Sequence, residues 1–332
     1  MHIADKMEKS AIINSKFKKQ RTTGVQRYAL GVSAFIDDAI FFEPKSKNSL
    51  LQVLWEQISL PLKAKREGLL LINFCNTAPF WYKKQMVTIH DMAVFENPVW
   101  FRPAFAKYYQ WLFKKLAKNA KHFVTVSEFS KQEIHRHLGI PLTKISIIHS
   151  AVSDDFIEVN SHKPASAPIG NFILMVGSHD PRKNFDFVIG ATQQWCTQNQ
   201  YQLVIAGNPG KAFADKALAP ETEAIWLQGL NDAELKWLYE NAKLVIHPSI
   251  YEGFSLVPIE AHLIGAKCLI SDIPVHREIV GKAAHYFELA NAEHLILQID
   301  HALNSPFEPI PLPYSFEKSG KDWMELISEM DA

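Results

Sequence analysis

Two series of short apolar runs, separated by helical patterns, constrain the fold of this 332-residue chain most strongly. The runs are rich in β-branched residues and continuously apolar, which is typical of parallel strands buried on both faces. The first series covers residues 11–14, 39–42, 69–75, 86–91, 122–128 and 144–150. The second series covers residues 171–177, 201–207, 224–229, 242–248, 266–271 and 284–287. This alternation predicts an α/β protein with two doubly wound parallel sheets.

A stretch rich in Pro, Ser and Ala separates the two series at residues 157–170 and has little periodicity, as a linker does. We therefore expect two Rossmann-like domains, 1–160 and 168–312, with a cleft between them in which a pocket can form. The last segment, 313–332, has a helical pattern of apolar residues. This helix is expected to pack back on the N-terminal domain.

The stretch EGFSLVPIE (252–260) places two carboxylates, Glu252 and Glu260, eight positions apart. A strand pattern precedes it, and a short helix is predicted at 258–265 with Pro258 in the first turn, where a missing N–H costs nothing. The N–H groups of the loop and of the helix N-terminus suit an anion such as a phosphate, and a carboxylate suits a diol. The stretch predicts a nucleotide-sugar pocket, and two solvated glutamates on a strand–loop–helix are the alternative.

Two other turns carry groups that suit a phosphate. Gly24 lies at the predicted start of a helix, where a backbone can approach a ligand closely. Arg182 and Lys183 lie in the turn GSHDPRKN (177–184), between a predicted strand and its helix. Cations at a helix N-terminus form a second candidate phosphate site. A lone glycine and a solvated basic turn are the alternatives.

His90 directly follows a predicted strand. Ligands of parallel sheets bind beyond the carboxyl ends of the strands. A histidine there can donate a hydrogen bond to a sugar hydroxyl and can titrate near neutral pH. Alternatively, His90 is a structural residue bonded to the neighbouring loop, and Asp91 orients it.

The charge is divided unevenly, although the chain as a whole has a formal net charge of zero. Residues 1–160 hold 23 Lys and Arg against 14 Asp and Glu, and the remainder holds 12 against 21. Such asymmetry suggests that the N-terminal half contacts a phosphorylated or membrane-borne partner. The alternative is that the surface charge is simply uneven. The basic amphipathic segment 102–122 either contacts an anionic membrane peripherally or packs its apolar stripe on the sheet.

Cys75, Cys196 and Cys268 show no paired spacing and are expected to be buried thiols in a reducing compartment, which favours the cytoplasm. The segment MHIADKMEKS (1–10) has no apolar core, so we expect no signal peptide. No run approaches the roughly 18 apolar residues that span a bilayer. We also expect no metal, because Asp272 after its strand lacks a second carboxylate.

On these motifs the chain resembles retaining glycosyltransferases of family 4, the group 1 glycosyl transferases, which have the GT-B fold. The strongest match is residues 252–287, from EGFSLVPIE to KAAHYF, which resemble the family signature. VGSHDPRKN (176–184) and VTVSEFSKQEI (124–134) are similar to two further family motifs. RTTGVQRYA (21–29) and VTIHD (87–91) resemble motifs of its mannosyltransferase-like branch.

The resemblance implies a role for each candidate residue. Glu260 would hold the ribose hydroxyls, Glu252 would contact the transferred sugar, and Lys183 would neutralise the diphosphate leaving group. His90 would touch the donor sugar. The remaining donor contacts would come from Gly24, Arg182, Gly253, Phe254, Ser255 and Leu256.

Two positions depart from the family pattern. Many members carry glycine where this chain has Ser255, which can alter the close approach of the backbone to the donor. Many also place an arginine where this chain has Ser178, and Arg182 is the residue that could substitute for it.

The implied reaction moves a hexose from a nucleoside diphosphate sugar to a glycan or lipid-linked glycan, with retention and without metal or other cofactor. The mannosyltransferase-like branch favours GDP-mannose, with UDP- and dTDP-sugars next. Surface polysaccharide assembly at the inner face of the cell membrane is the implied context. The alternatives are a silent nucleotide-sugar binding protein or partner subunit, and an epimerase or phosphorylase on the same fold. Nucleic-acid binding is disfavoured because the basic residues match no reading motif.

Overall fold

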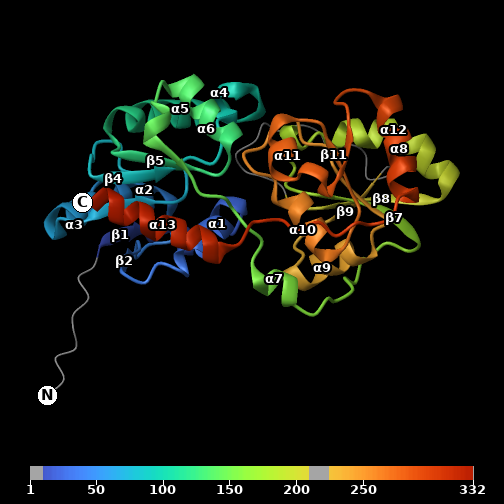
Figure 1. Ribbon diagram of the computed structural model, residues 1–332, viewed down its shortest axis with the longest axis horizontal. Helices are drawn as coiled ribbons and strands as arrows, with labels where there is room; N and C mark the ends of the chain where they lie inside the picture. The colour runs from blue at the N-terminus through green and yellow to red at the C-terminus, as the bar shows by residue number, and fades with distance from the viewer. Residues whose placement is uncertain (1–9, 209–223, 332) are drawn as a thin grey trace, which may run out of the picture. The chain divides into compact units, whose positions relative to one another are not determined.

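The computed structural model describes residues 10–208 and 224–331, so most of the MHIADKMEKS segment lies outside the described residues (Figure 1). The chain forms two compact units. The first comprises Met1–Met92, Lys107–Ala151 and Tyr314–Ala332. The second comprises Ala93–Ala106 and Val152–Pro313.

The first unit contains a six-stranded parallel sheet in the order β2-β1-β3-β4-β5-β6. Its strands are β1 (Ala11–Asn14), β2 (Ala39–Phe42), β3 (Leu70–Asn73), β4 (Gln85–Thr88), β5 (His122–Thr125) and β6 (Ile145–Ile147). Every residue of β1, β3, β4 and β5 is buried, so these strands show no alternation of buried and exposed residues, and their polar members such as Gln85 and His122 are buried as well.

Helices cover both faces of this sheet. They are α1 (Gly24–Ser33), α2 (Ser49–Gln57), α3 (Ser59–Glu67), most of α5 (Pro103–Asn119), α6 (Glu128–Leu138) and α13 (Phe316–Asp331), with 3-10 turns at Ser15–Lys19 and Leu142–Lys144. The last helix, α13, packs against α1 and β3 (Figure 1). Its fully buried Trp323 donates from Nε1 to the Tyr28 hydroxyl at 2.8 Å and meets the Phe74 ring edge-on at 5.0 Å.

The second unit contains another six-stranded parallel sheet, in the order β12-β11-β10-β7-β8-β9. Its strands are β7 (Asn171–Val176), β8 (Tyr201–Ala206), β9 (Ile225–Leu227), β10 (Leu244–His247), β11 (Cys268–Ser271) and β12 (His285–Phe287). Two parallel sheets with intervening helices confirm the predicted α/β class.

The helices of the second unit are α4 (Ala93–Glu96), α7 (Asp154–Glu158), α8 (Phe185–Asn199), α9 (Asp232–Asn241), α10 (Leu256–Ile264), α11 (Pro274–Ile279) and α12 (Ala292–Asn304), with 3-10 turns at Pro98–Trp100, Pro181–Lys183 and Gly281–Ala283. Some of these helices connect its strands, whereas α4 and α7 precede β7 and α12 follows β12. The prediction of a helix at 258–265 was two residues late, because Leu256 and Val257 already have helical geometry before Pro258.

The order of the second sheet positions the candidate residues. The chain runs from β7 outward through β8 and β9, and then returns to build β10, β11 and β12 on the other side of β7. The strand order therefore reverses between β7 and β10, and such a switch point opens a crevice at the carboxyl ends of the two strands. The turn 177–184 follows β7 and the loop 248–255 follows β10, so both segments lie at this point.

Candidate functional site

Lys183 and Glu252 meet at the switch point of the second sheet. The Lys183 ammonium donates to Glu252 Oε1, and both side chains are nearly buried. Burial by itself would raise the pKa of Glu252, but the opposing charge of Lys183, helped by His247 and Arg182, outweighs it and holds that pKa well below its ordinary value. Glu252 is therefore an ionised carboxylate at neutral pH.

Two groups from the end of β10 support the same carboxylate oxygen. The Ser249 hydroxyl donates to Glu252 Oε1 at 2.7 Å, and His247 Nε2 lies 3.4 Å from it. Burial lowers the pKa of His247, so the imidazole is neutral at pH 7. These contacts all use Oε1, and within the described residues no hydrogen bond is made to Oε2. The carboxylate is thus oriented through one oxygen, and the other can accept from a ligand.

Ser255 precedes α10 in a left-handed conformation, with φ of 76°. His276 Nδ1 must donate to the Ser271 carbonyl at 2.7 Å, because a carbonyl oxygen only accepts. His276 Nε2 therefore accepts from the Ser255 hydroxyl at 2.9 Å. Burial, followed by the nearby His247, lowers the pKa of His276 to about 3. A neutral, fully buried imidazole thus holds the loop in front of α10.

Glu260 lies in α10, and its carboxylate is held by a hydrogen bond from a residue of α9. Its Oε2 accepts from the Tyr239 hydroxyl at 2.7 Å, and Tyr239 is fully buried with its ring edge-on to Phe156 at 6.2 Å. This contact holds the carboxylate in one orientation, as the recognition of a diol requires.

Arg182 is turned toward its own loop. Its Nε and Nη2 donate to Asp180 Oδ2 at 2.9 and 2.6 Å, and its backbone N–H donates to Asp180 Oδ1 at 2.9 Å. The Asp180 side chain is fully buried. Asp180 therefore compensates the charge of Arg182. That Arg182 takes the role of the arginine that many family members carry at the position of Ser178 stays a prediction.

The backbone between the two glutamates leads directly into a helix N-terminus. Gly253 and Phe254 form a bend and Leu256 is the first residue of α10. N–H groups in the first turn of a helix have no acceptor within that helix, and the helix dipole adds positive potential. This end of α10 can bind an anion beside Lys183.

Gly24 and His90 belong to the first unit. Gly24 is the first residue of α1, after a capping box of Thr23 and Gln26. His90 is 8% exposed, donates from Nε2 to the Phe74 carbonyl at 2.8 Å and has its pKa lowered by burial. A neutral His90 therefore offers a ligand the acceptor Nδ1, rather than the donor considered from the sequence.

The sequence did not point to His247, Ser249, Ser271 and His276 as site residues. His247 ends β10 and Ser271 ends β11, so the signal that singled out His90, a polar residue at a strand end, was present for them. His276 lies in α11 and carries no such signal.

The second unit also has a groove of about 490 Å³, which Tyr201, Lys243 and Ala266 help to line. These residues lie at the amino ends of β8, β10 and β11. The groove is thus at the opposite edge of the sheet from Lys183 and Glu252, where ligands of parallel sheets seldom bind.

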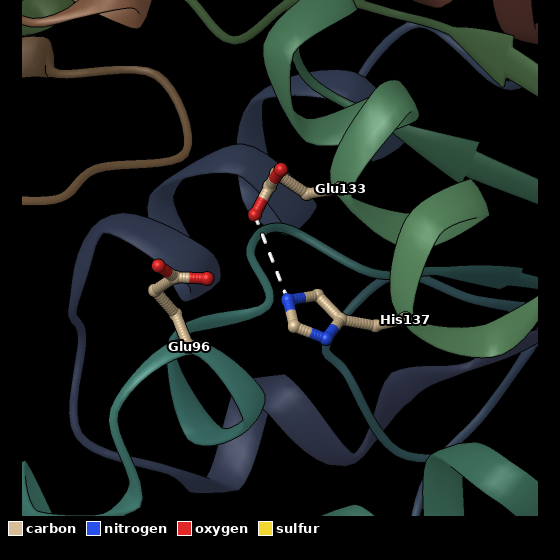
Figure 2. Close-up of side chains that lie close together, drawn as sticks. All are labelled: Glu96, Glu133 and His137. Atoms are coloured by element: carbon tan, nitrogen blue, oxygen red, sulfur yellow. Dashed lines mark ion pairs between the residues drawn. The ribbon is translucent and has the colours of Figure 1, made fainter.

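Acidic and histidine side chains also gather near α6. Figure 2 shows Glu133 and His137, one helical turn apart, with His137 Nε2 3.6 Å from Glu133 Oε2. Glu96, also drawn there, belongs to the other unit. The contact joins two neighbouring turns of one helix, and Glu133 also pairs with Arg136.

Comparison with protein families decides the relationship. Residues 157–323 match the model described as glycosyl transferases group 1, and residues 29–156 match glycosyltransferase family 4. The chain belongs to the glycosyl transferases group 1. The resemblance inferred from EGFSLVPIE and the accompanying motifs is confirmed.

Among curated glycosyltransferases, the O-antigen chain mannosyltransferase RfbU of Salmonella typhimurium is 31% identical over 212 residues, covering 61% of this chain and 56% of the relative. O-antigen chain mannosyltransferase B of Escherichia coli is 29% identical over 223 residues, covering 62% of this chain and 57% of the relative. The chain thus matches a little over half the length of these curated relatives.

Solved glycosyltransferase structures share the fold. Anabaena HepE in complex with UDP-glucose has a TM-score of 0.66 at 14% identity and covers 96% of this chain and 99% of its own. WaaG, a glycosyltransferase involved in lipopolysaccharide biosynthesis, has a TM-score of 0.62 at 15% identity, covering 97% and 95%. These matches confirm the GT-B fold class.

Within the described residues, no helix combines the length and the apolar composition needed to cross a membrane.

Proposed function

We propose that this glycosyltransferase moves a hexose, with GDP-mannose as the favoured donor, to a hydroxyl of a glycan or lipid-linked glycan, with retention of configuration. The observation that carries the proposal is the Lys183–Glu252 pair beside the N-terminus of α10 at the switch point. The mannosyltransferase names of the relatives support the choice of sugar. Their O-antigen context supports surface polysaccharide assembly.

Lys183 serves the leaving group in this proposal. The bond from the anomeric carbon to the donor phosphate breaks, and its electron pair leaves with the diphosphate. Lys183 exchanges its contact with Glu252 for the diphosphate oxygens, and the α10 N-terminus adds positive potential. The charge of the departing diphosphate is thereby stabilised without a divalent cation, and no metal is needed in the scheme.

Retention follows from the position of the acceptor. The acceptor hydroxyl attacks the anomeric carbon on the face from which the diphosphate leaves, and its proton passes to the departing phosphate oxygen. No protein base is then required. Glu252 accepts from a hydroxyl of the transferred sugar through Oε2 and so positions the reacting carbon. Glu260, fixed by Tyr239, holds the ribose hydroxyls.

The roles of the two glutamates can be separated by experiment. A thermal-shift screen of nucleoside diphosphates and their sugars should single out GDP and GDP-mannose, because binding stabilises the folded state by RT ln(1 + [L]/Kd). We expect Glu252→Gln to keep the nucleotide response and lose transfer by about a hundredfold or more, as lost transition-state contacts do. Glu260→Gln should lose the nucleotide response first. Equal nucleotide responses in wild type and Glu260→Gln would refute the ribose contact.

Transfer itself distinguishes the remaining alternatives. An epimerase would convert one donor into another without any acceptor, which an NMR time course would show. A silent binding protein would respond to a nucleotide sugar and turn over none. Unchanged transfer in Lys183→Met would contradict its role at the leaving group.

A further inference from the structure

A short segment between β4 and the main part of α5, residues 93–106, belongs to the second unit, although the chain on both sides of it belongs to the first. The segment comprises α4, the 3-10 turn Pro98–Trp100 and the start of α5. Four of its residues are aromatic, namely Phe95, Trp100, Phe101 and Phe105. We name residues 93–106 the aromatic segment.

The turn in the middle of the aromatic segment is held by local contacts. The Trp100 N–H donates to the Asn97 carbonyl at 3.3 Å, and the Phe101 N–H donates to the Pro98 carbonyl at 3.2 Å. The Phe101 ring stacks on Phe105, with centroids 5.6 Å apart, and Phe101 is buried. Trp100 and Phe101 are therefore presented from a fixed turn.

Both rings contact the loops that follow β7 and β10. The guanidinium carbon of Arg182 lies 5.6 Å from the centroid of the Phe101 ring, a cation–π contact. The Trp100 ring meets the Tyr251 ring with centroids 6.2 Å apart and an angle of 46° between the planes. One loop thus receives each aromatic side chain.

These two contacts place the aromatic segment beside the candidate catalytic pair. Arg182 directly precedes Lys183 in the chain, and Tyr251 directly precedes Glu252. The two loops are also joined to each other, because the Ile250 N–H donates to the Arg182 carbonyl at 2.8 Å. The segment therefore lies against the same two loops that bring the lysine and the glutamate together.

The Trp100 contact lies on one side of Glu252 along the loop. Tyr251 comes before Glu252, whereas residues 253–256, whose N–H groups can bind an anion, come after it. Trp100 itself is only half-buried, and the neighbouring Val99 is 78% exposed. An indole that is partly open to solvent thus lies next to the loop, away from the end that suits a phosphate.

We propose that Trp100 binds a sugar ring of the acceptor glycan by stacking, beside the sugar that is transferred. The C–H groups on one face of a hexose carry partial positive charge and the face of an indole is negative, so the two faces attract each other. Sites for small ligands commonly combine aromatic side chains with a few polar groups, here Glu252. Tyr251 supports the indole on its other contact. This inference rests on the proposed function, because it assigns a subsite to the acceptor of that reaction.

Saturation-transfer NMR on the full chain tests the subsite directly. The probes are the methyl α-glycosides of mannose, glucose, galactose and N-acetylglucosamine, titrated with GDP present. Wild type should bind at least one of them. Trp100→Ala should weaken that binding by about tenfold or more, as the loss of an apolar contact in a specific site does. Trp100→Phe keeps an aromatic face and should keep most of the affinity.

A second Trp–Tyr pair in the same unit supplies a matched control. The Trp195 and Tyr201 rings also lie at 46° to each other, with centroids 5.1 Å apart. Tyr201 begins β8, so this pair is at the opposite edge of the sheet from the two loops. Trp195→Ala should lose stability, as Trp100→Ala does, yet bind the glycoside like wild type.

Three results would overturn the proposal. The first is a wild-type protein that binds none of the glycosides. The second is unchanged glycoside affinity in Trp100→Ala. The third is loss of the GDP thermal shift in Trp100→Ala but not in Trp195→Ala, since the ring would then hold the base of the nucleotide.

The outcome is separable from that of the proposed function. Glycoside binding that depends on Trp100, in a protein that transfers no sugar from any nucleotide sugar, would refute the proposed reaction and support the subsite. Where wild type does transfer, Trp100→Ala should raise the KM for the acceptor about tenfold or more and leave the KM for the donor unchanged. A fall in kcat with both KM values unchanged would contradict the subsite.

Discussion

Ser255 stands where many family members carry glycine, and its backbone conformation costs free energy. A left-handed φ of 76° suits glycine, which many members carry at this position, and a side chain there is strained by roughly 1–2 kcal/mol. In this chain the Ser255 hydroxyl gains a hydrogen bond to the buried His276. The bond offsets the strain, so serine and glycine are two solutions for the same backbone.

Two substitutions at Ser255 separate strain from bonding. Ser255→Ala keeps the strain and leaves His276 Nε2 without its donor, so unfolding free energy should fall by about 1–3 kcal/mol. Ser255→Gly loses the same bond but relieves the strain, so it should be less destabilising than alanine by roughly 1 kcal/mol. Urea denaturation of both variants measures the difference. Identical losses would show that the backbone is not strained.

The buried His276 should make stability depend on pH. Its pKa falls to about 3 in the folded protein, whereas an unfolded histidine titrates near 6.5. Below about pH 6.5 the unfolded state binds the extra proton, so stability is complete above that pH and decreases as the pH falls toward 3.

The share of His276 in the slope of that decrease can be measured. Each such histidine contributes up to about 1.4 kcal/mol per pH unit, so His276→Gln should flatten the dependence of the urea midpoint between pH 6.5 and 5. The exposed His162→Gln is the comparison for removing a histidine from the surface. A slope that survives His276→Gln in full would show that other groups cause it.

At the scale of elements, two glycines permit the close crossing of α1 and α13. A Cβ on Gly31 would lie 2.5 Å from the Phe316 ring, and one on Gly320 would lie 2.3 Å from Phe35 Cβ. Neither distance can be accommodated without movement. The small size of these residues, rather than their backbone freedom, therefore matters.

Gly31→Ala should destabilise the protein even though alanine is the better helix former. Overpacking against Phe316 costs about 1–3 kcal/mol, against a gain of up to about 1 kcal/mol in helix propensity. The control is Gly190→Ala in the exposed part of α8, where an added Cβ meets nothing within 4 Å. That control should raise the thermal midpoint, and a Gly31→Ala variant that does the same would contradict the tight crossing.

At the scale of the whole molecule, the candidate residues are divided between two units. Lys183, Glu252 and Glu260 lie in the second, and Gly24 and His90 lie in the first. The predicted domain boundaries and the participation of both units in donor binding remain predictions.

Hydrogen exchange with and without nucleotide tests this division. GDP should slow exchange in residues 177–184 and 249–256, because these segments contact the diphosphate in our proposal. GDP-mannose should also protect the segment around Gly24 and His90. Protection confined to the second unit with both ligands would remove Gly24 and His90 from the donor site.

The approximate positions of the strands and the family could be predicted from the sequence alone. Each predicted apolar run overlaps an observed strand, because strands buried on both faces are mainly apolar, although β4 begins at Gln85, one residue before its run. Most observed strands are shorter than their predicted runs, since residues such as His90 and Asp91 lie beyond the last paired residue of β4. EGFSLVPIE was recognisable because its carboxylates, loop and helix start are local in sequence.

The contacts between distant side chains could not be predicted from the sequence. Lys183 and Glu252 are 69 residues apart and touch because β10 returns to pair with β7. His276 in α11 accepts a hydrogen bond from the Ser255 hydroxyl, and Asp180 accepts one from the Arg182 guanidinium. The exposure of Leu50, Leu54 and Leu62 likewise follows from which side of α2 and α3 the core covers. A linear pattern specifies periodicity and local turns, whereas strand order, which depends on the whole sheet, specifies contacts between distant residues.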